Sequence, residues 1–244
     1  MDGLILALQF FTRIPVGKEV SFNEKNIGRS LFFLPFIGII IGCIAALPII
    51  MLHSTSKMIA SLLSILVIAT FTGGLHLDGL ADTFDGFLSG RKRDRVMEIM
   101  KDSTLGSFGA LALIFLILSK FVAVYELPAS AWIAIPLSLA NARLVAGYVI
   151  LAKKNAREDG LGVLFKSSVA GKNIIMAGII YIGIIMFINP WYILPLAGSL
   201  VVGEAMTLWS YKKIDGLTGD VYGAIIELCE VASMIIFWGV TVWI

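Results

Sequence analysis

Charged residues are scarce in this chain of 244 residues. They make up 15% of it, whereas hydrophobic residues make up 58%. Soluble domains are typically about half apolar and about a quarter charged, so the composition argues against an ordinary soluble domain. Cysteine is scarcer still, because Cys43 and Cys229 stand alone and far apart inside apolar runs. The sequence therefore gives no basis for a disulfide framework or a thiolate metal site.

The first residues lack the features of a signal peptide. No basic region precedes the short apolar run, and no small-residue cleavage site follows it. Ile5, Leu8 and Phe11, with Arg13 close by, predict instead a helix that lies at the membrane surface. The net charge of +2 is too small to indicate nucleic acid as a partner.

Long apolar runs fill most of the chain, and a helix needs about 20 residues to cross the hydrocarbon core of a membrane. We therefore expect an all-α fold: an integral membrane helical bundle that crosses the membrane about seven times. It should form a single domain over residues 1–244, since no internal repeat or linker is visible. The expected spans are 31–52, 58–77, 107–125, 131–152, 174–188, 192–210 and 223–243.

Positive charge is unevenly distributed between the loops. Sixteen of the 19 Lys and Arg residues lie in four segments, 1–30, 78–106, 153–173 and 211–222. The loops expected on the other side hold Lys57 alone. The positive-inside rule makes the basic side cytoplasmic, which predicts a protein of the cytoplasmic membrane with its N-terminus inside. The acid-rich loops lie on the same side, so we expect the chemistry to be cytoplasmic.

The stretch GGLHLDGLADTFDG, residues 73–86, places Asp78, Asp82 and Asp85 at the end of an apolar run. At about 100° per residue these side chains share one face of a helix. Unpaired carboxylates repel one another and are costly near a bilayer. Mg²⁺, which prefers oxygen ligands, would neutralise them; the alternative is a solvated helix end with surface acids. His76 joins the candidate substrate site, although a hydrogen-bonded residue at a helix end is the simpler interpretation.

A second group of acids follows in residues 215–233. Asp220, Glu227 and Glu230 share one broad helical face with Gly223, whose lack of a side chain permits a close approach. Acids inside a span indicate a functional site. The alternative for the two glutamates is internal pairing with Lys120 or Arg143.

The stretch MKDSTLGSFG, residues 100–109, offers phosphate ligands before a helix. Lys101 supplies positive charge, Asp102 and Ser103 supply oxygens, and the N-terminus of a helix favours anions. Such a string is also typical of an ordinary capped helix start.

Arginines mark a further candidate phosphate site. Arg143 lies in NAR at 141–143, and Arg157 begins the loop AREDGLG with Asp159 close behind. A guanidinium can bind phosphate through two parallel hydrogen bonds, and Asp159 can orient an arginine or the metal. Ordinary loop charge is the alternative for Arg157. Acids for a divalent metal and basic groups for phosphates together favour phosphoryl or nucleotidyl transfer.

These stretches, together with LQFFTRIPV near the start and GLTGDVYGAIIELCE near the end, resemble the cobalamin synthase (adenosylcobinamide-GDP ribazoletransferase) family. The resemblance runs in order from about residue 4 to 232. It implies a Mg²⁺-dependent membrane enzyme for the last assembly step of vitamin B12. Adenosylcobinamide-GDP would react with α-ribazole or its 5′-phosphate and release GMP. The acids also resemble, more loosely, those of the CDP-alcohol phosphotransferases.

The residue patterns and the family resemblance together predict roles for the candidate residues. We expect Mg²⁺ to be held by Asp78, Asp82, Asp85 and Asp220. Asp85 is the first choice for the base, and Asp82 and Lys101 are also expected to be catalytic. The phosphates would be held by Lys101, Arg143 and Arg157. The metal, an arginine or the ribazole would be positioned by Asp159, Glu227 and Glu230. Membrane lipid, a second copy of the chain and other cobalamin-synthesis enzymes are the expected partners.

Two other classes of function remain open from the residues alone. A transporter should carry polar residues near the middle of several spans, whereas most acids here gather at the expected cytoplasmic ends, with Glu204 and Glu230 as partial exceptions. An alcohol phosphotransferase of the phospholipid type predicts the same acid cluster but not the other motifs.

Overall fold

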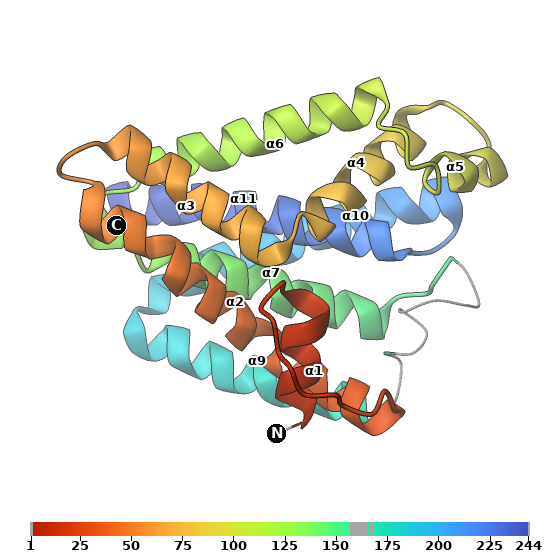
Figure 1. The fold of residues 1–244 in the computed structure, drawn as a ribbon, viewed down its shortest axis with the longest axis horizontal. Helices are drawn as coiled ribbons and strands as arrows, with labels where there is room; N and C mark the ends of the chain where they lie inside the picture. Colours follow the sequence, from red (N-terminus) through yellow and green to blue (C-terminus); the bar gives the residue numbers. More distant parts are fainter. Residues whose placement is uncertain (1, 157–164, 166–167, 244) are drawn as a thin grey trace.

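The computed structural model describes residues 2–156, 165 and 168–243. Helices form almost all of this part of the chain (Figure 1). The helices are α1 (Asp2–Phe11), α2 (Glu24–Leu52), α3 (Lys57–Thr72), α4 (Leu75–Leu88), α5 (Arg93–Ile99), α6 (Ser107–Glu126), α7 (Ala134–Ala152), α9 (Ser168–Ile188), α10 (Ile193–Ile214) and α11 (Gly219–Trp243). Short 3₁₀ turns, η1 (Ala129–Ala131) and η2 (Pro190–Tyr192), precede α7 and α10.

The expected number of spans is confirmed. Within the described residues, α2, α6, α7, α9, α10 and α11, some with their 3₁₀ turns, are each long and apolar enough to cross a membrane. The pair α3 and α4 passes the same test only when its two helices are taken together, which makes up to seven spans. The short helix α1 is apolar, as expected for the N-terminal segment. The chain is therefore a multi-pass membrane protein.

Local capping moves one helix boundary away from the expected position. Helix α2 begins at Glu24, well before the expected start of the first span, because the side chain of Asn23 accepts a hydrogen bond of 2.9 Å from the backbone N–H of Asn26. This N-cap satisfies one of the free amide groups of the first turn. Helix α9 also begins earlier than expected, at Ser168 rather than at residue 174.

The second expected span, 58–77, is wrong at its end. Helix α3 stops at Thr72, and the chain turns by 88° before α4 begins. Gly73 and Gly74 make this turn with φ angles of 64° and 71°, a left-handed conformation that residues with a side chain rarely adopt. The segment after α1 also fastens the turn, since the backbone N–H of Arg13 donates to the carbonyl of Phe71 at 2.7 Å. The bend directs α4 away from the axis of α3.

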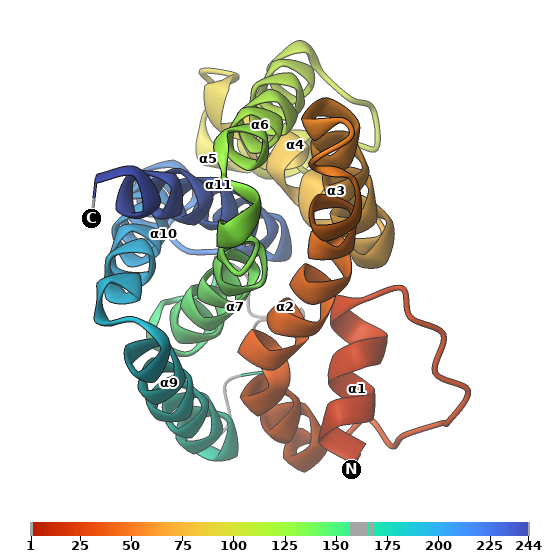
Figure 2. The same ribbon diagram turned by 90° about the vertical axis from the view of Figure 1, so that its left-hand side faces the viewer.

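Helices α2 and α7 form the centre of the bundle (Figure 2). Two glycines one turn apart on α2 allow the contact, because a Cβ at Gly38 would lie 2.7 Å from the backbone of Leu139 and one at Gly42 would lie 2.8 Å from the nitrogen of Pro136. Small residues four apart are the usual device for close helix packing in membranes. Around this pair lie α1, α9, α10 and α11, while α3, α4 and α6 gather at one side (Figures 1 and 2).

A second close contact joins α4 to α11. A Cβ at Gly79 would lie 2.8 Å from the backbone oxygen of Asp220, and one at Gly223 would lie 3.2 Å from the Cα and the carbonyl oxygen of His76. Each helix thus presses its backbone against the other at a glycine. The contact brings together two stretches of sequence that lie far apart along the chain, and both carry acids.

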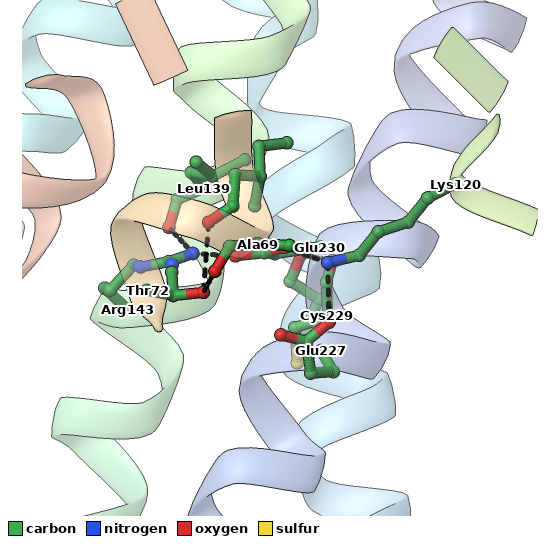
Figure 3. A network of polar contacts seen from close by, with 10 residues as sticks. Ala69, Thr72, Lys120, Leu139, Arg143, Glu227, Cys229 and Glu230 are labelled. Atoms are coloured by element: carbon green, nitrogen blue, oxygen red, sulfur yellow. Dashed lines mark hydrogen bonds and ion pairs between the residues drawn. The ribbon is translucent and has the colours of Figure 1, made fainter. Parts of the chain in front are cut away.

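A buried ion cluster ties α6, α7 and α11 together. Lys120 on α6 donates to both Glu227 and Glu230 on α11, and Arg143 on α7 donates to Glu230. Figure 3 shows Lys120 reaching the glutamates from one side and Arg143 from the other. None of the four side chains is more than 4% exposed. Two positive and two negative groups leave the cluster neutral, which removes the large cost of an isolated buried charge.

The α4–α11 contact predicts that Gly79→Ala destabilises the protein. The new methyl group would meet backbone atoms, which cannot rotate away, so one helix must shift; such overpacking costs about 1–3 kcal/mol. Thermal unfolding in detergent measures the effect. Gly183→Ala on α9 is the control, because a Cβ there meets nothing within 4 Å and alanine favours a helix. Equal melting temperatures for the two variants would contradict the contact.

The ion cluster predicts a larger effect for Glu230→Gln. Removing one carboxylate leaves buried positive charge uncompensated, which costs about 3–5 kcal/mol. We expect a correspondingly lower melting temperature, and recovery of part of the loss in the double variant Glu230→Gln/Arg143→Gln, which removes one charge of each sign. The exposed pair of Arg95 and Glu98 supplies the control: Glu98→Gln should cost less than about 1 kcal/mol. Additive effects in the double variant would show that the pair does not interact.

Candidate active site

A cavity of about 230 Å³ opens at the end of the bundle where α4 and α11 begin and α7 ends. Helix α1 closes one side of it with Phe10 and Phe11. The α4–α11 contact supplies the polar part of the wall, His76, Asp78 and Asp220. The other lining residues are Leu34, Leu75, Ala146, Ile150, Phe165, Gly219, Tyr222, Gly223 and Ile226. The cavity therefore lies directly beside the first acids predicted from the sequence.

The acids gather as predicted, although they come from two helices. Asp78, Asp82 and Asp85 all lie on α4, as expected, and Asp220 begins α11 beside Gly79. Asp82 lies on α4 between Asp78 and Asp85, and the negative charges of Asp78, Asp220 and Asp85 all act on its carboxyl group. Negative charge is therefore concentrated around Asp82.

Asp85 has a partner that the sequence did not reveal. Its two carboxylate oxygens accept hydrogen bonds of 2.8 Å from the backbone N–H groups of Gly106 and Gly109, at the start of α6. An anion is favourable at this position, because the first amides of a helix lack partners within the helix. A Cβ at either glycine would collide with this carboxyl group. Asp85 therefore caps α6 and holds the preceding loop against α4.

The acids match the chemistry of Mg²⁺ but do not form a complete cage. Carboxylate oxygens are the ligands that Mg²⁺ prefers, and this ion commonly takes only one or two carboxylates, with substrate phosphates completing its shell. In the described part of the chain, no group of three or more His, Cys, Asp or Glu side chains is placed to hold a metal ion. Asp78 and Asp220, which share the cavity wall, suit such a partial site. Asp220 also accepts a hydrogen bond of 3.3 Å from Thr218.

Lys101, Asp102 and Ser103 lie in the exposed loop between α5 and α6. The side chain of Asp102 accepts a hydrogen bond of 2.9 Å from the backbone N–H of Thr104. This bond lowers the pKa of Asp102 and makes the residue a local turn former. The capping of α6 by Asp85 places the end of the loop beside α4, and Lys101 is left exposed to solvent.

The structure favours internal pairing for the three charged residues expected to bind substrate from within the spans. Arg143, Glu227 and Glu230 belong to the buried ion cluster and are at most 1% exposed. The physical reason is their depth: each lies near the middle of its helix, where a charge needs an opposite charge more than it needs a ligand. The Nη2 atom of Arg143 is nevertheless buried without a hydrogen-bond partner among the described residues.

Three predicted site residues remain to be placed: Arg157, Asp159 and His76. Arg157 and Asp159 lie outside the described residues. His76 lies in the first turn of α4, as the simpler interpretation held, but its Nδ1 atom is buried and finds no hydrogen-bond partner in the described chain. It also lines the cavity. A buried donor or acceptor without a partner is uncommon and costly, so His76 stays in the candidate site.

Residues that the sequence analysis did not assign to the site form much of the cavity. Phe10 and Phe11 belong to α1, which was expected only at the membrane surface, and Tyr222 follows Asp220 by two positions on α11. The Tyr222 hydroxyl donates a hydrogen bond of 2.7 Å to the side chain of Asn155. The paired phenylalanines of LQFFTRIPV were the available signal, since this stretch already contributed to the family resemblance.

Comparison with known proteins agrees with this arrangement of motifs. Residues 3–238 match the family model described as Cobalamin-5-phosphate synthase. A protein of Treponema denticola named adenosylcobinamide-GDP ribazoletransferase is 36% identical over 96% of both chains. Proteins with the same name from Clostridium botulinum and Shigella flexneri are 38% and 35% identical, covering 97% and 93% of this chain and 97% and 96% of their own. No solved structure matches. The chain belongs to the cobalamin-5-phosphate synthase family.

Proposed function

We propose that this protein is an adenosylcobinamide-GDP ribazoletransferase of the bacterial cytoplasmic membrane. Its substrates are adenosylcobinamide-GDP and α-ribazole, or α-ribazole 5′-phosphate, and its products are adenosylcobalamin, or its phosphate, and GMP. Family membership over residues 3–238 and the names of the relatives support this assignment. The chain is thus a transferase of cobalamin synthesis.

The reaction exchanges one phosphorus–oxygen bond for another. The 3′-hydroxyl oxygen of ribazole forms a bond to the phosphorus next to the cobinamide aminopropanol. The bond between that phosphorus and the bridging oxygen breaks, and GMP leaves with the electron pair. The hydroxyl proton passes to a base of the protein. Positioning and stabilisation of charge supply most of the catalysis in such a transfer.

The contact between α4 and α11 is the observation that carries the proposal. It places Asp78 and Asp220 together on the wall of a cavity, with Asp82 one turn further along α4. The crowding of Asp82 by Asp78, Asp220 and Asp85 supports a site in which negative charge is concentrated. A site of this kind suits a metal-assisted diphosphate, because the cation of the complex offsets the acids.

Mg²⁺ is the proposed cofactor, and Asp78 and Asp220 would hold it. When bound, the ion would supply positive charge that offsets the negative charge of the diphosphate and of the leaving group. Asp85 contributes to this arrangement indirectly, since its bonds to Gly106 and Gly109 fix the loop that carries Lys101. Lys101 then provides positive charge for the diphosphate from the solvent side.

The base is reassigned from Asp85 to Asp82. Both carboxylate oxygens of Asp85 already accept hydrogen bonds from the backbone N–H groups of Gly106 and Gly109, so this side chain is committed to capping α6. Asp82 lies between the cavity and the loop of Lys101 and is only partly buried. We assign it the role of accepting the ribazole hydroxyl proton.

This assignment predicts that Asp82→Asn lowers kcat for GMP release at least a hundredfold, the lower end of the range for general acid–base catalysis. The melting temperature in detergent should stay close to that of the wild type, because Asn keeps the size of Asp and no hydrogen bond to the Asp82 side chain is lost within the described residues. Asp94→Asn on α5 is the control, since the side chain of Asp94 is 95% exposed and should leave kcat unchanged. Near-normal kcat for Asp82→Asn would remove it as the base.

A cytoplasmic site predicts a definite labelling pattern. In a Cys43→Ser background, a cysteine introduced by Ser103→Cys before α6 should react with a membrane-impermeant thiol reagent only in inverted vesicles. One introduced by Ser54→Cys, in the turn between α2 and α3, should react only in right-side-out spheroplasts. Both serines are exposed, and the remaining Cys229 is buried. The opposite pattern would place the site on the outer face.

A further inference from the structure

The cavity beside the acids has an unusual lining for an enzyme of phosphates. Four aromatic rings line it, those of Phe10, Phe11, Phe165 and Tyr222, and aliphatic side chains supply half of the remaining lining residues. Phe165 packs against both neighbours from α1, with ring centroids 6.2 Å from Phe10 and 6.1 Å from Phe11. Such a wall suits a flat apolar ring system rather than a phosphate.

We propose that this cavity receives the aromatic base of the acceptor nucleoside, and that it thereby selects which base is built into the product. The proposal rests on the proposed function, since it takes the acceptor to be a ribazole. A cavity of about 230 Å³ is smaller than the usual site for a drug-sized molecule. It is of the right scale for one fused ring system and too small for a corrinoid.

The polarity of the wall distinguishes the acceptor base from the purine bases of the donor substrate. A guanine or adenine presents several donors and acceptors along its edge, each of which loses free energy when buried without a partner. The base of α-ribazole is a benzimidazole, which presents a single free ring nitrogen once it carries the ribose. Tyr222 has no hydrogen left to donate to a ligand, because its hydroxyl already donates to Asn155. Away from Asp78 and Asp220, the lining therefore favours the base with the fewest polar atoms.

His76 lies on the polar side of the cavity wall. Its Nδ1 atom is buried and has no hydrogen-bond partner in the described chain, so this atom is turned away from the cavity. The side chain therefore contributes ring surface to the wall, and its Nδ1 atom does not add a hydrogen-bonding group that a purine would need.

The position of the acids completes the geometry. Asp78 and Asp220 lie on the same wall as His76, so a base held among the phenylalanines leaves its ribose beside the carboxylates. The attacking hydroxyl belongs to that ribose. The cavity thus orients the acceptor from its apolar end, while the acids and Lys101 act on the phosphates.

The experiment alters the cavity from two sides and measures KM for each substrate. Ala146→Leu on α7 fills the cavity, and Phe11→Ala on α1 widens it. Ala205→Leu and Phe187→Ala make the same changes at exposed positions and serve as controls. The acceptors are α-ribazole, its analogue without the two ring methyl groups, and the analogue with adenine. Melting temperatures identify any variant that fails to fold.

We expect Ala146→Leu to raise KM for α-ribazole at least tenfold, to raise that for the smaller benzimidazole analogue less, and to leave KM for adenosylcobinamide-GDP within twofold. Phe11→Ala should reduce the preference for α-ribazole over the adenine analogue by about tenfold, the effect of removing contacts to two methyl groups. The control variants should match the wild type.

Two outcomes would overturn the proposal. A selective rise in KM for adenosylcobinamide-GDP would show that the cavity binds a base of the donor substrate. Unchanged KM values for both substrates in both variants would show that neither substrate uses the cavity, which would then be a site for lipid or detergent. Failure of the proposed function is distinguishable, because the wild type would then release no GMP with any acceptor. Calorimetric binding of α-ribazole to wild-type and Ala146→Leu protein would still test whether the cavity binds the base. Equal affinities of the two proteins would reject the proposal.

Discussion

The close approach of α4 and α11 is the constraint on which the candidate site depends. Gly79 and Gly223 let two backbones touch, and through that contact acids separated by more than a hundred residues face one cavity. The 88° turn before α4 serves the same end, because it aims that helix across the start of α11 instead of continuing α3. Helix α6 joins through the bonds of Asp85 to its first amides. Steric fit at two glycines thus organises the electrostatics.

Charge within the spans follows a different rule from charge at the cavity. Lys120, Arg143, Glu227 and Glu230 neutralise one another where water is excluded. The acids at the start of α11 and on α4 gather instead at the end of the bundle. A transporter would expose polar groups along a path through the spans. Here the buried charged side chains of the described spans pair with one another, which suits a scaffold, and the candidate site lies at its end.

Local features of the fold and site were predictable from the sequence, and contacts between distant segments were not. The helix that carries the first three acids followed from its periodicity, because rotation per residue is a local property. The turn at Gly73 and Gly74 was missed, since glycine also occurs inside membrane helices and the left-handed angles arise with the packing of the N-terminal segment. For Arg143 and Glu230, pairing could be named as an alternative but not chosen, because the rotation of three helices decides it. The capping role of Asp85 is of the same kind.

The composition of the buried ion cluster also sets an order for biogenesis. Its cations reside on α6 and α7, which are synthesised in succession, while both anions reside on α11, the last helix of the described chain. A nascent chain that has inserted α6 and α7 therefore holds two unmatched cations in an apolar surrounding until α11 arrives. In such an intermediate the two cations must be stabilised by another protein or by water at the bilayer surface. Chains that terminate before α11 would leave both cations without their carboxylate partners, so the packing of α6 and α7 depends on the last helix of the described chain.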